Sequence, residues 1–562
     1  MKVFSWLIIA ILFGVWLGLL FYFDEVPRAL RWPARFVLVS AGALAIGCTL
    51  FRLRQNLLPL GRLFCKANGR PDFLIIALLL SIQGIVVYNA VTHNAVINFD
   101  YRPHADNIEV WSQGRIPVAD DTRGFHYAPL MYLLPAWIHA SGATLREALK
   151  AAQILNSVYC LILLLYLLAL CQLLRPGDAL LRRMALLTLG CLPVFYKSFA
   201  FARPEPMLSM LALASLYYGL RLLVGQKLRK SDVILFGLTV GLAMLARQWA
   251  AFFFPAFGLL LLWQLWQRYQ KPQTLVLGLV VAALISVSIG SWYYIHLTLR
   301  YGTPAAFNSE LQAFSFSNKP ASFYWDWKPE QLFGFPVTPT LTNRLGPMLF
   351  TETWGDYLGY WRLYPLRLNH PGAAPHNWDE AGAHQGQVNL AAVYPSVLLL
   401  IAFLAGLWCC RKLIRRQAWP GFELPGRVLL SLAVLGTCLG YFVFVVSYVN
   451  SSAIRATYIL QIFPPLAILM GFWWTSILRQ RTRLGALLLG AWLACMIPIV
   501  PMFFSNHINL SGLRVLMPLE RPLIGSTLLL GIILWVIILR MNRSEPASAS
   551  SPSAIRHDPA PA

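Results

Sequence analysis

The sequence predicts an all-α integral membrane protein. Of its 562 residues, 58% are hydrophobic and only 12% are charged, whereas a soluble domain has about 25% charged residues. Runs of about 20 apolar residues recur along the chain, and this is the length that a helix needs to cross the hydrocarbon core of a bilayer. The 20 Trp and 22 Tyr residues suit the two membrane–water interfaces, where aromatic rings are half buried.

Taken in order, the apolar runs predict about fourteen membrane-spanning helices. The first begins directly after Lys2 and is too long for the apolar core of a signal peptide, so we expect it to be a span. A shorter apolar stretch at 129–140 is expected to lie along the outer interface instead. The predicted spans are residues 3–23, 34–51, 73–92, 151–174, 184–201, 206–224, 233–246, 250–266, 274–297, 390–410, 428–449, 456–477, 484–504 and 523–539.

The distribution of positive charge fixes the orientation of these spans. With the N-terminus inside, every even-numbered loop is rich in Lys and Arg, as in the loop after the tenth span with Arg411, Lys412, Arg415 and Arg416. Cytoplasmic loops of membrane proteins carry such an excess. The net charge of +23 therefore predicts contact with membrane lipids, and we expect no nucleic-acid partner.

This topology divides the chain into transmembrane bundles separated by two polar segments on the outer face. The second outer segment is rich in aromatic residues, Pro and Gly, so we expect it to fold against the membrane surface. The predicted regions are N-terminal helices (1–92), a first outer loop with interfacial helices (93–150), a central bundle (151–297), a large outer loop (298–389), a C-terminal bundle (390–540) and a disordered tail (541–562).

The first outer loop concentrates titratable side chains in a chain that otherwise has few acids. Within thirty residues it carries Asp100, His104, Asp106, Glu109, Asp120, Asp121 and His126. A partly desolvated carboxylate beside a membrane can serve as a general base that takes a proton from a hydroxyl. The alternative is a solvated loop whose charges only keep it out of the bilayer.

Short motifs in this loop and in two later helices resemble the GT-C-type glycosyltransferases that use polyprenyl-phosphate donors. The motifs are Asp100 after a span, GRIP at 114–117, YAPLMY at 127–132, FARPEP at 201–206, and RATY at 455–458 followed by FPPLA at 463–467. They are similar in order and placement to those of the protein O-mannosyltransferases, the lipid A aminoarabinose transferases and the bacterial polyprenol-dependent mannosyltransferases. The resemblance implies a GT-C-like bundle with a catalytic acid on the outer face.

The resemblance also implies roles for individual residues. Many family members have two adjacent acids at the catalytic position, whereas Tyr101 follows Asp100 here, so the base is either Asp100 or Asp106. The donor phosphate needs cations, and Arg forks well onto phosphate oxygens. Arg455, Arg203 and Arg247 are the candidates, with Arg455 preferred and Lys197 as a lesser one. The alternative for each arginine is snorkelling or a structural ion pair, for instance with Glu205.

Candidates for the acceptor side are His104 and Tyr127 in the first outer loop, and Trp354 and Asp356 in the motif TETWGDYLGYWRLYP of the second. Aromatic faces stack on sugars, but they also anchor loops at interfaces. We predict no obligatory cofactor or metal. A divalent metal stays an alternative, because Asp100, His104 and Asp106 have suitable donor atoms.

The resemblance implies an inverting transfer of a sugar from a polyprenyl-phosphate donor to an acceptor (lipid, glycan or protein) at the outer face. We expect a multi-pass protein of a bacterial inner membrane with a periplasmic active site. The rival function is a transporter or flippase, which places ionisable residues near the bilayer midplane. The predicted spans contain almost no acids, which favours the enzyme.

Overall fold

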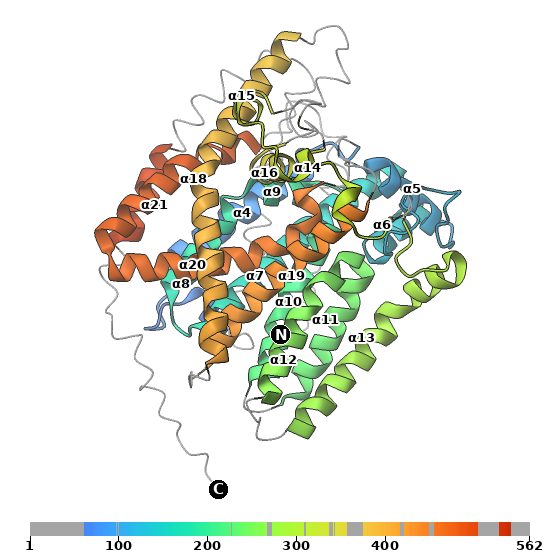
Figure 1. Cartoon of the computed structure of the whole chain (residues 1–562), viewed down its shortest axis with the longest axis horizontal. Coiled ribbons are helices and arrows are strands. Elements are labelled where there is room, and N and C mark those ends of the chain that lie inside the picture. Colours follow the sequence, from blue (N-terminus) through green and yellow to red (C-terminus); the bar gives the residue numbers. More distant parts are fainter. Residues whose placement is uncertain are drawn as a thin grey trace, which may run out of the picture.

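The computed structural model is built from helices (Figure 1). It describes residues 61–96, 98, 100–225, 228–266, 272–307, 311–336, 341, 343–356, 375–415, 421–448, 454–503 and 528–540. Within these residues there is no β-strand, and the β-type pairing is limited to two isolated bridges. The all-α prediction is confirmed. The predicted spans at 3–23 and 34–51 and the tail at 541–562 lie outside the described residues.

Eight helices of the described chain are long and apolar enough to cross a bilayer. There are nine if the bent pair α8 (Ala179–Gly190) and α9 (Pro193–Ala200) counts as one span. Because other predicted spans lie outside the described residues, the total of fourteen stays a prediction. The eight are α4 (Phe73–Thr92), α7 (Leu145–Leu174), α10 (Glu205–Val224), η5 (Gln248–Phe253) continued by α12 (Phe254–Trp266), α13 (Pro272–Tyr301), α18 (Pro375–Ile414), α19 (Glu423–Ser447), and η9 (Ala456–Ile462) continued by α20 (Phe463–Gln480).

The predicted span at 184–201 is wrong as a single straight helix. The chain forms α8 (Ala179–Gly190) and α9 (Pro193–Ala200), which meet at an angle of 65°. Pro193 lacks a backbone N–H, and its ring disfavours helical backbone at Leu192, which is extended with ψ 111°. The break leaves α9 as a short separate helix that carries Lys197.

The predicted span at 233–246 forms α11 (Lys230–Ala246), which packs on α10 and α13 and is not among the eight long apolar helices. The described chain also has three shorter apolar helices: α6 (Leu130–Ala140), α21 (Thr482–Met496) and the segment Leu528–Arg540. Helix α6 packs on α5 (Tyr101–Ser112) at one edge of the molecule (Figure 1). On α6, Leu133, Leu134 and Trp137 are exposed, the last by 67%. An apolar exposed face on a helix too short to cross fits the predicted interfacial position of this segment.

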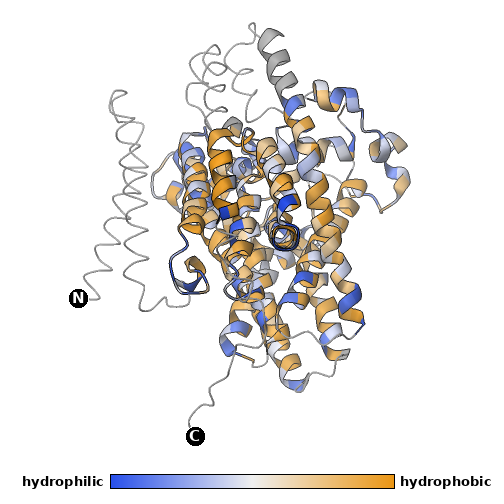
Figure 2. Cartoon of the chain, turned by 90° about the vertical axis from the view of Figure 1, so that its left-hand side faces the viewer, coloured by the Kyte–Doolittle hydropathy of each residue, from blue (hydrophilic) through white to orange (hydrophobic). Residues whose placement is uncertain are grey.

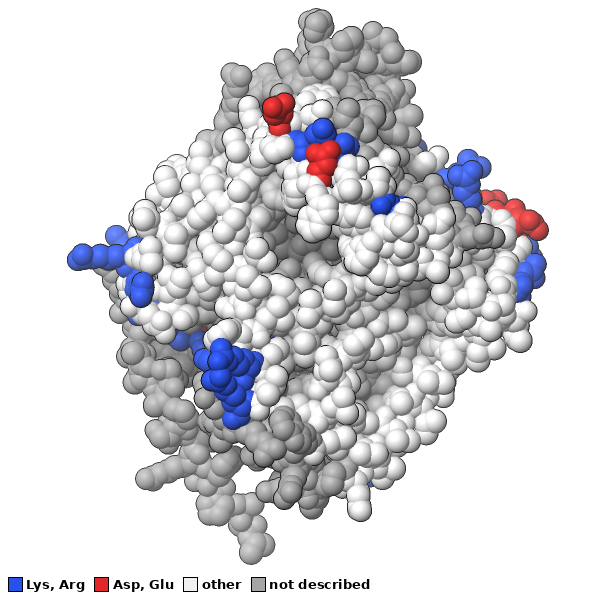
Figure 3. Space-filling model, in the orientation of Figure 1, with Lys and Arg blue, Asp and Glu red and all other residues white. Residues whose placement is uncertain are grey.

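Apolar side chains both fill the core and cover much of the surface. The helix formed by η9 and α20 is the most enclosed of the eight, with 89% of the residues in its most apolar stretch buried. Helix α13 exposes large aliphatic side chains such as Leu277 and Leu284, by 63% and 62%. Apolar residues follow most helices along their length (Figure 2), and charged side chains on the face in Figure 3 are confined to a few groups. Such a surface suits lipid contact rather than water.

Two ion pairs, one of them fully buried, join the helix ends opposite the first outer loop. Arg183 of α8 binds Asp72, the N-cap of α4, with 2.6 Å between Nη2 and Oδ2, and both side chains are fully buried. Arg479 near the end of α20 pairs with Asp178, the N-cap of α8. These contacts fix α4, α8 and α20 relative to one another, and so fix the opposite ends of the same helices, where the candidate site lies.

Candidate active site

Asp100 sits at the turn between α4 and α5 in a backbone conformation that few residues adopt. Its φ is 60° and ψ is 24°, the left-handed region, which Asp tolerates better than most side chains. Although it occupies the N-cap position of α5, its carboxylate makes no capping hydrogen bond. Instead, its Oδ2 accepts a hydrogen bond of 3.0 Å from the hydroxyl of Tyr458. The first outer loop therefore meets the segment that leads into α20.

Two arginines beside Asp100 share one glutamate. Glu205, the first residue of α10, binds Arg203 at 2.8 Å and Arg247 at 3.4 Å, and all three side chains are buried. The ion pair between Arg203 and Glu205, which the sequence left as an alternative, is present. The Arg247 guanidinium lies 4.2 Å from the centre of the Tyr127 ring, and both arginines lie over Tyr458, at 5.4 and 5.6 Å. These cation–π contacts hold the two aromatic rings next to Asp100.

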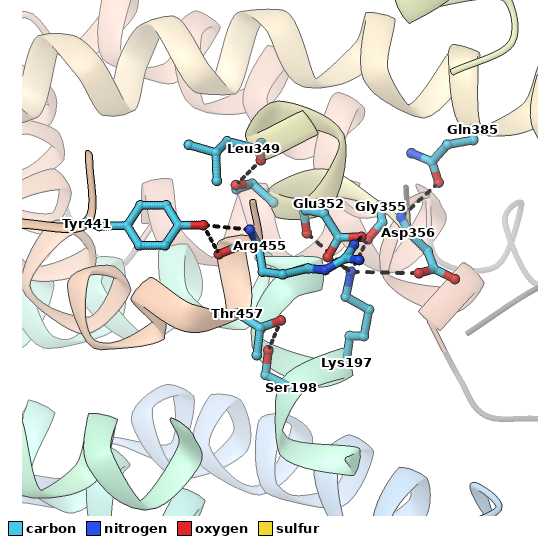
Figure 4. Close-up of polar contacts among 11 residues, drawn as sticks. Lys197, Ser198, Leu349, Glu352, Gly355, Asp356, Gln385, Tyr441, Arg455 and Thr457 are labelled. Carbon is cyan, nitrogen blue, oxygen red and sulfur yellow. Dashed lines mark hydrogen bonds and ion pairs between the residues drawn. The ribbon is translucent and has the colours of Figure 1, made fainter. Parts of the chain in front are cut away.

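A second buried charge cluster lies around Glu352 of α16 (Leu345–Trp354), as Figure 4 shows. Lys197 Nζ of α9 is 2.9 Å from Glu352 Oε2, and Arg455 Nη1 is 3.7 Å from Glu352 Oε1. Lys197 also donates to the carbonyl of Gly355 at 2.8 Å and lies 3.9 Å from Asp356. Burial acts to raise the pKa of Glu352, but Lys197 and Arg455 outweigh it and hold this pKa below its usual value.

Local backbone contacts set the position of Arg455. Tyr441 of α19 accepts a hydrogen bond of 2.6 Å from the Arg455 N–H and donates to its carbonyl at 3.1 Å (Figure 4). Two residues later, Thr457 bonds Ser198 of α9 at 3.1 Å. Pro464 and Pro465 open α20, and they favour a helix start at that point, so the preceding residues form the separate 3-10 segment η9.

The two clusters are neighbours. Arg203 contributes to lowering the pKa of Glu352, and the charge of Asp100 acts on Arg203. Together the clusters hold four bases, Lys197, Arg203, Arg247 and Arg455, and four acids, Asp100, Glu205, Glu352 and Asp356. Within the described part of the chain, Asp100 is the one acid of this group without an ion pair. An anionic ligand must therefore compete with Glu205 and Glu352 for the bases.

Of the other predicted residues of the first outer loop, Asp106 lies apart from the arginines of the site, whereas His104 and Tyr127 are buried near them. Asp106 is 26% exposed and pairs with Arg102 at 3.3 Å, away from the arginines of the site, and burial raises its pKa despite Arg102. His104 is buried, and its Nδ1 lies 2.7 Å from the Tyr132 hydroxyl. Burial, and then the charges of Arg203 and Arg247, hold the pKa of His104 well below its usual value, so the ring is neutral. Tyr127 lies 5.2 Å from this ring, centre to centre.

The predicted residues of the second outer loop have different surroundings. Trp354 is only 2% exposed and belongs to the hydrophobic core. Asp356 joins the Glu352 cluster, and its backbone N–H donates to the side-chain oxygen Oε1 of Gln385 at 3.2 Å. The aromatic residues that follow at 357–361 lie outside the described residues. In the described chain, no group of three or more His, Cys, Asp or Glu side chains is placed to hold a metal ion.

Sequence reasoning missed Glu352 and gave Tyr458 no role. Glu352 lies in the apolar stretch LGPMLFTETW, and a single acid in such a stretch indicates a buried ion pair. Tyr458 belongs to the RATY motif, but its contact with Asp100 joins residues 358 positions apart. No spacing rule connects such positions.

Comparison with known proteins gives matches only at the level of structure. No family model matches the sequence, and no curated protein matches it either. The chain is similar to the crystal structure of ArnT from Cupriavidus metallidurans bound to undecaprenyl phosphate, with a TM-score of 0.44, 13% identity, and coverage of 83% of this chain and 77% of that one. The apo structure of the same protein gives a TM-score of 0.43, again with 13% identity, over 83% of this chain and 76% of that one.

Proposed function

We propose that the protein is a GT-C-type membrane glycosyltransferase that moves a sugar from a polyprenyl-phosphate donor to an acceptor hydroxyl at the outer face of the membrane. The observation that carries the proposal is the meeting of Asp100 with Arg203, Arg247 and the Arg455–Tyr458 segment at one end of the bundle. Asp100, Arg203 and Tyr458 belong to three of the motifs that resemble this family, and these motifs are far apart in sequence, yet the three side chains are neighbours there. A base beside several cations is what transfer from a phosphate requires.

In the proposed reaction, Asp100 takes the proton of the acceptor hydroxyl. The acceptor oxygen forms a bond to the anomeric carbon while the bond from that carbon to the phosphate oxygen breaks. The electron pair of the broken bond leaves with the lipid phosphate, whose negative charge the arginines stabilise. A single displacement of this kind inverts the anomeric carbon. Asp100 suits the role of base better than Asp106, because Asp106 is tied to Arg102.

The bases that bind the phosphate are proposed to be Arg203, Arg247 and Arg455, with Lys197 beside them. Each already has a carboxylate partner, so the donor phosphate replaces part of the interaction with Glu205 or Glu352. A pre-paired arginine keeps a fixed position without ligand and avoids the cost of an isolated buried charge. The isoprenoid chain of the donor stays among the apolar surfaces of the spans.

The test uses purified full-length protein in proteoliposomes and a panel of radiolabelled undecaprenyl-phosphate monosaccharides. A membrane extract is added to supply lipid, glycan and protein acceptors, and disappearance of the labelled donor on thin-layer chromatography measures transfer. We expect Asp100→Asn to lower the rate by roughly 10²–10⁴-fold, and Asp106→Asn to retain most of it. The matched control Asp121→Asn removes an acid of the same loop that pairs with Arg115. Full activity in Asp100→Asn removes the base assignment. Lack of transfer with every donor, together with solute flux across the vesicles, supports the transporter instead.

A further inference from the structure

Tyr458 contacts both the proposed base, Asp100, and two arginines of the site. Its hydroxyl donates to Asp100 Oδ2 at 3.0 Å, and its ring lies under the guanidinium groups of Arg203 and Arg247. The side chain is only 7% exposed. Two cations near a phenol make it a stronger hydrogen-bond donor, because they stabilise the negative charge that develops on its oxygen.

The backbone on both sides of this contact fixes its geometry. Asp100 has the left-handed conformation and does not use its carboxylate to cap α5. Tyr458 lies in η9, whose next residue, Ile459, has non-helical backbone angles of φ −109° and ψ 26°. The chain therefore leaves regular helix geometry at Asp100 and directly after Tyr458, close to the point where the two side chains meet. Trp249 packs 6.0 Å from the Tyr458 ring, centre to centre, and limits its rotation.

We propose that Tyr458 is a positioning residue for Asp100, which holds the carboxylate by one oxygen and leaves the other oxygen for the acceptor hydroxyl. The inference rests on the proposed function, since it assigns Tyr458 a role through the proposed base. The hydrogen bond stabilises the ionised carboxylate, the form that accepts a proton. It also fixes the rotamer of Asp100, and a general base must be held within hydrogen-bond reach of the proton that it takes.

The test is Tyr458→Phe in the full-length protein, in the same proteoliposome assay. We expect kcat to fall by roughly 10–100-fold, with KM for the lipid donor within about twofold, because the lost hydroxyl binds Asp100 in the free protein and has no proposed part in binding the donor. The acid limb of the pH–rate profile moves to higher pH, by roughly one pH unit, because the charged form of the base loses a stabilising donor. A merely structural role for Tyr458 does not move this limb.

The matched control is Tyr394→Phe. Tyr394 donates to the carbonyl of Leu488 at 2.9 Å, so its variant also loses a phenol hydrogen bond between two helices, outside the site. We expect wild-type kcat and an unchanged acid limb in Tyr394→Phe. An unmoved acid limb and wild-type kcat in Tyr458→Phe, with Asp100→Asn inactive, overturn the inference and leave the proposed function standing. Full activity in Asp100→Asn overturns both.

If Tyr458→Phe folds poorly, a second measurement tests the same inference. Incorporation of 3-fluorotyrosine at position 458 keeps the shape of the ring and makes the phenol more acidic, and so a stronger donor. The expected result is an acid limb at lower pH than that of the wild type, the opposite direction to Tyr458→Phe. An acid limb that does not move in the fluorinated protein contradicts the inference.

Discussion

Each base of the site is held by a carboxylate, and this pairing sets how tightly an anion can bind. Glu352 lies between Lys197 and Arg455, at 2.9 and 3.7 Å. Replacing it with Gln removes the competing charge while keeping the side-chain shape. We expect Glu352→Gln to bind undecaprenyl phosphate roughly three- to tenfold more tightly, or up to about 1.4 kcal/mol. Titration of the protein in detergent with undecaprenyl phosphate measures this affinity.

The control for this titration is Glu423→Gln, which loses the ion pair with Arg175 outside the site and is expected to bind like the wild type. Weaker binding in Glu352→Gln contradicts the prediction. It means that Glu352 orients the two bases for the phosphate instead of competing with it.

Because His126 is buried, we expect the free energy of unfolding of the protein to decrease at acid pH. Burial, and then the charge of Arg247, lower its pKa to about 3, whereas the unfolded chain has the ordinary value of about 6.5. Below that value the unfolded chain binds a proton that the folded protein does not, so stability decreases as the pH falls from 6.5 towards 3. At pH 4.5 the loss is about 2–3 kcal/mol. Thermal unfolding in detergent at pH 7.5 and pH 4.5 measures it.

The comparison variant is His126→Asn, which does not titrate in this range. We expect the difference in unfolding temperature between the two pH values to be smaller in His126→Asn than in the wild type. His104 remains in that variant and acts in the same direction, so part of the acid sensitivity persists. Equal pH dependence in the two proteins argues against a neutral buried His126.

How far single residues could be predicted depends on how local their signals are. Asp100 and Arg455 stand in motifs that mark them in the sequence, and the structure brings their segments together. The contacts of Glu352 and Tyr458 join positions that are far apart in the sequence. Glu352 and Arg455 are 103 positions apart, and Tyr458 and Asp100 are 358 positions apart. Without an alignment, the sequence does not say which distant positions touch.

At the scale of elements, the lengths of the apolar runs predicted most helices, and one predicted span proved to be bent at a proline. Pro193 divides the expected span at 184–201 into α8 and α9, with a bend of 65°. The bend has a consequence for the site, because Lys197 on α9 reaches Glu352 and Gly355. Hydropathy averages over such a break and sees only one apolar run.

We expect the protein to be strongly destabilised if one partner of the buried ion pair between Asp72 and Arg183 is removed. This pair joins α4 and α8 at the ends that lie away from the site. Both side chains are fully buried, and Asp72 also accepts a hydrogen bond from the Ile75 N–H. Removing one partner leaves a buried charge without compensation, at a cost of about 3–5 kcal/mol. We expect Asp72→Asn to lower the unfolding temperature strongly, as followed by protease resistance during heating.

Two further variants serve as controls for Asp72→Asn. Arg102→Gln breaks an ion pair whose Arg side chain is 77% exposed, and we expect a change within about 0.5 kcal/mol. The double variant Asp72→Leu with Arg183→Met removes both charges and should recover part of the stability lost in Asp72→Asn. A wild-type unfolding temperature in Asp72→Asn shows that water or another group compensates Arg183.

At the scale of the whole molecule, the chain direction of α20 links the site to the predicted topology. Tyr458 and Arg455 lie before the start of α20, and Arg481 follows its end at Gln480. Eighteen helical residues rise about 27 Å, close to the thickness of the hydrocarbon core. We therefore predict that Arg481 and the site lie on opposite sides of the membrane. The basic loop that contains Arg481 is predicted to be cytoplasmic, and these two predictions together put the site at the outer face.

Cysteine labelling tests this orientation in a background without the nine native cysteines. Arg115 is exposed in the first outer loop, and Arg481 is exposed after α20. We expect Arg115→Cys to react with a membrane-impermeant maleimide applied to intact spheroplasts, and Arg481→Cys to react only after permeabilisation. The reverse pattern places Asp100 and its arginines on the cytoplasmic side and contradicts transfer at the outer face. Labelling of both residues from outside contradicts α20 as a complete span, because its two ends then share one side of the membrane.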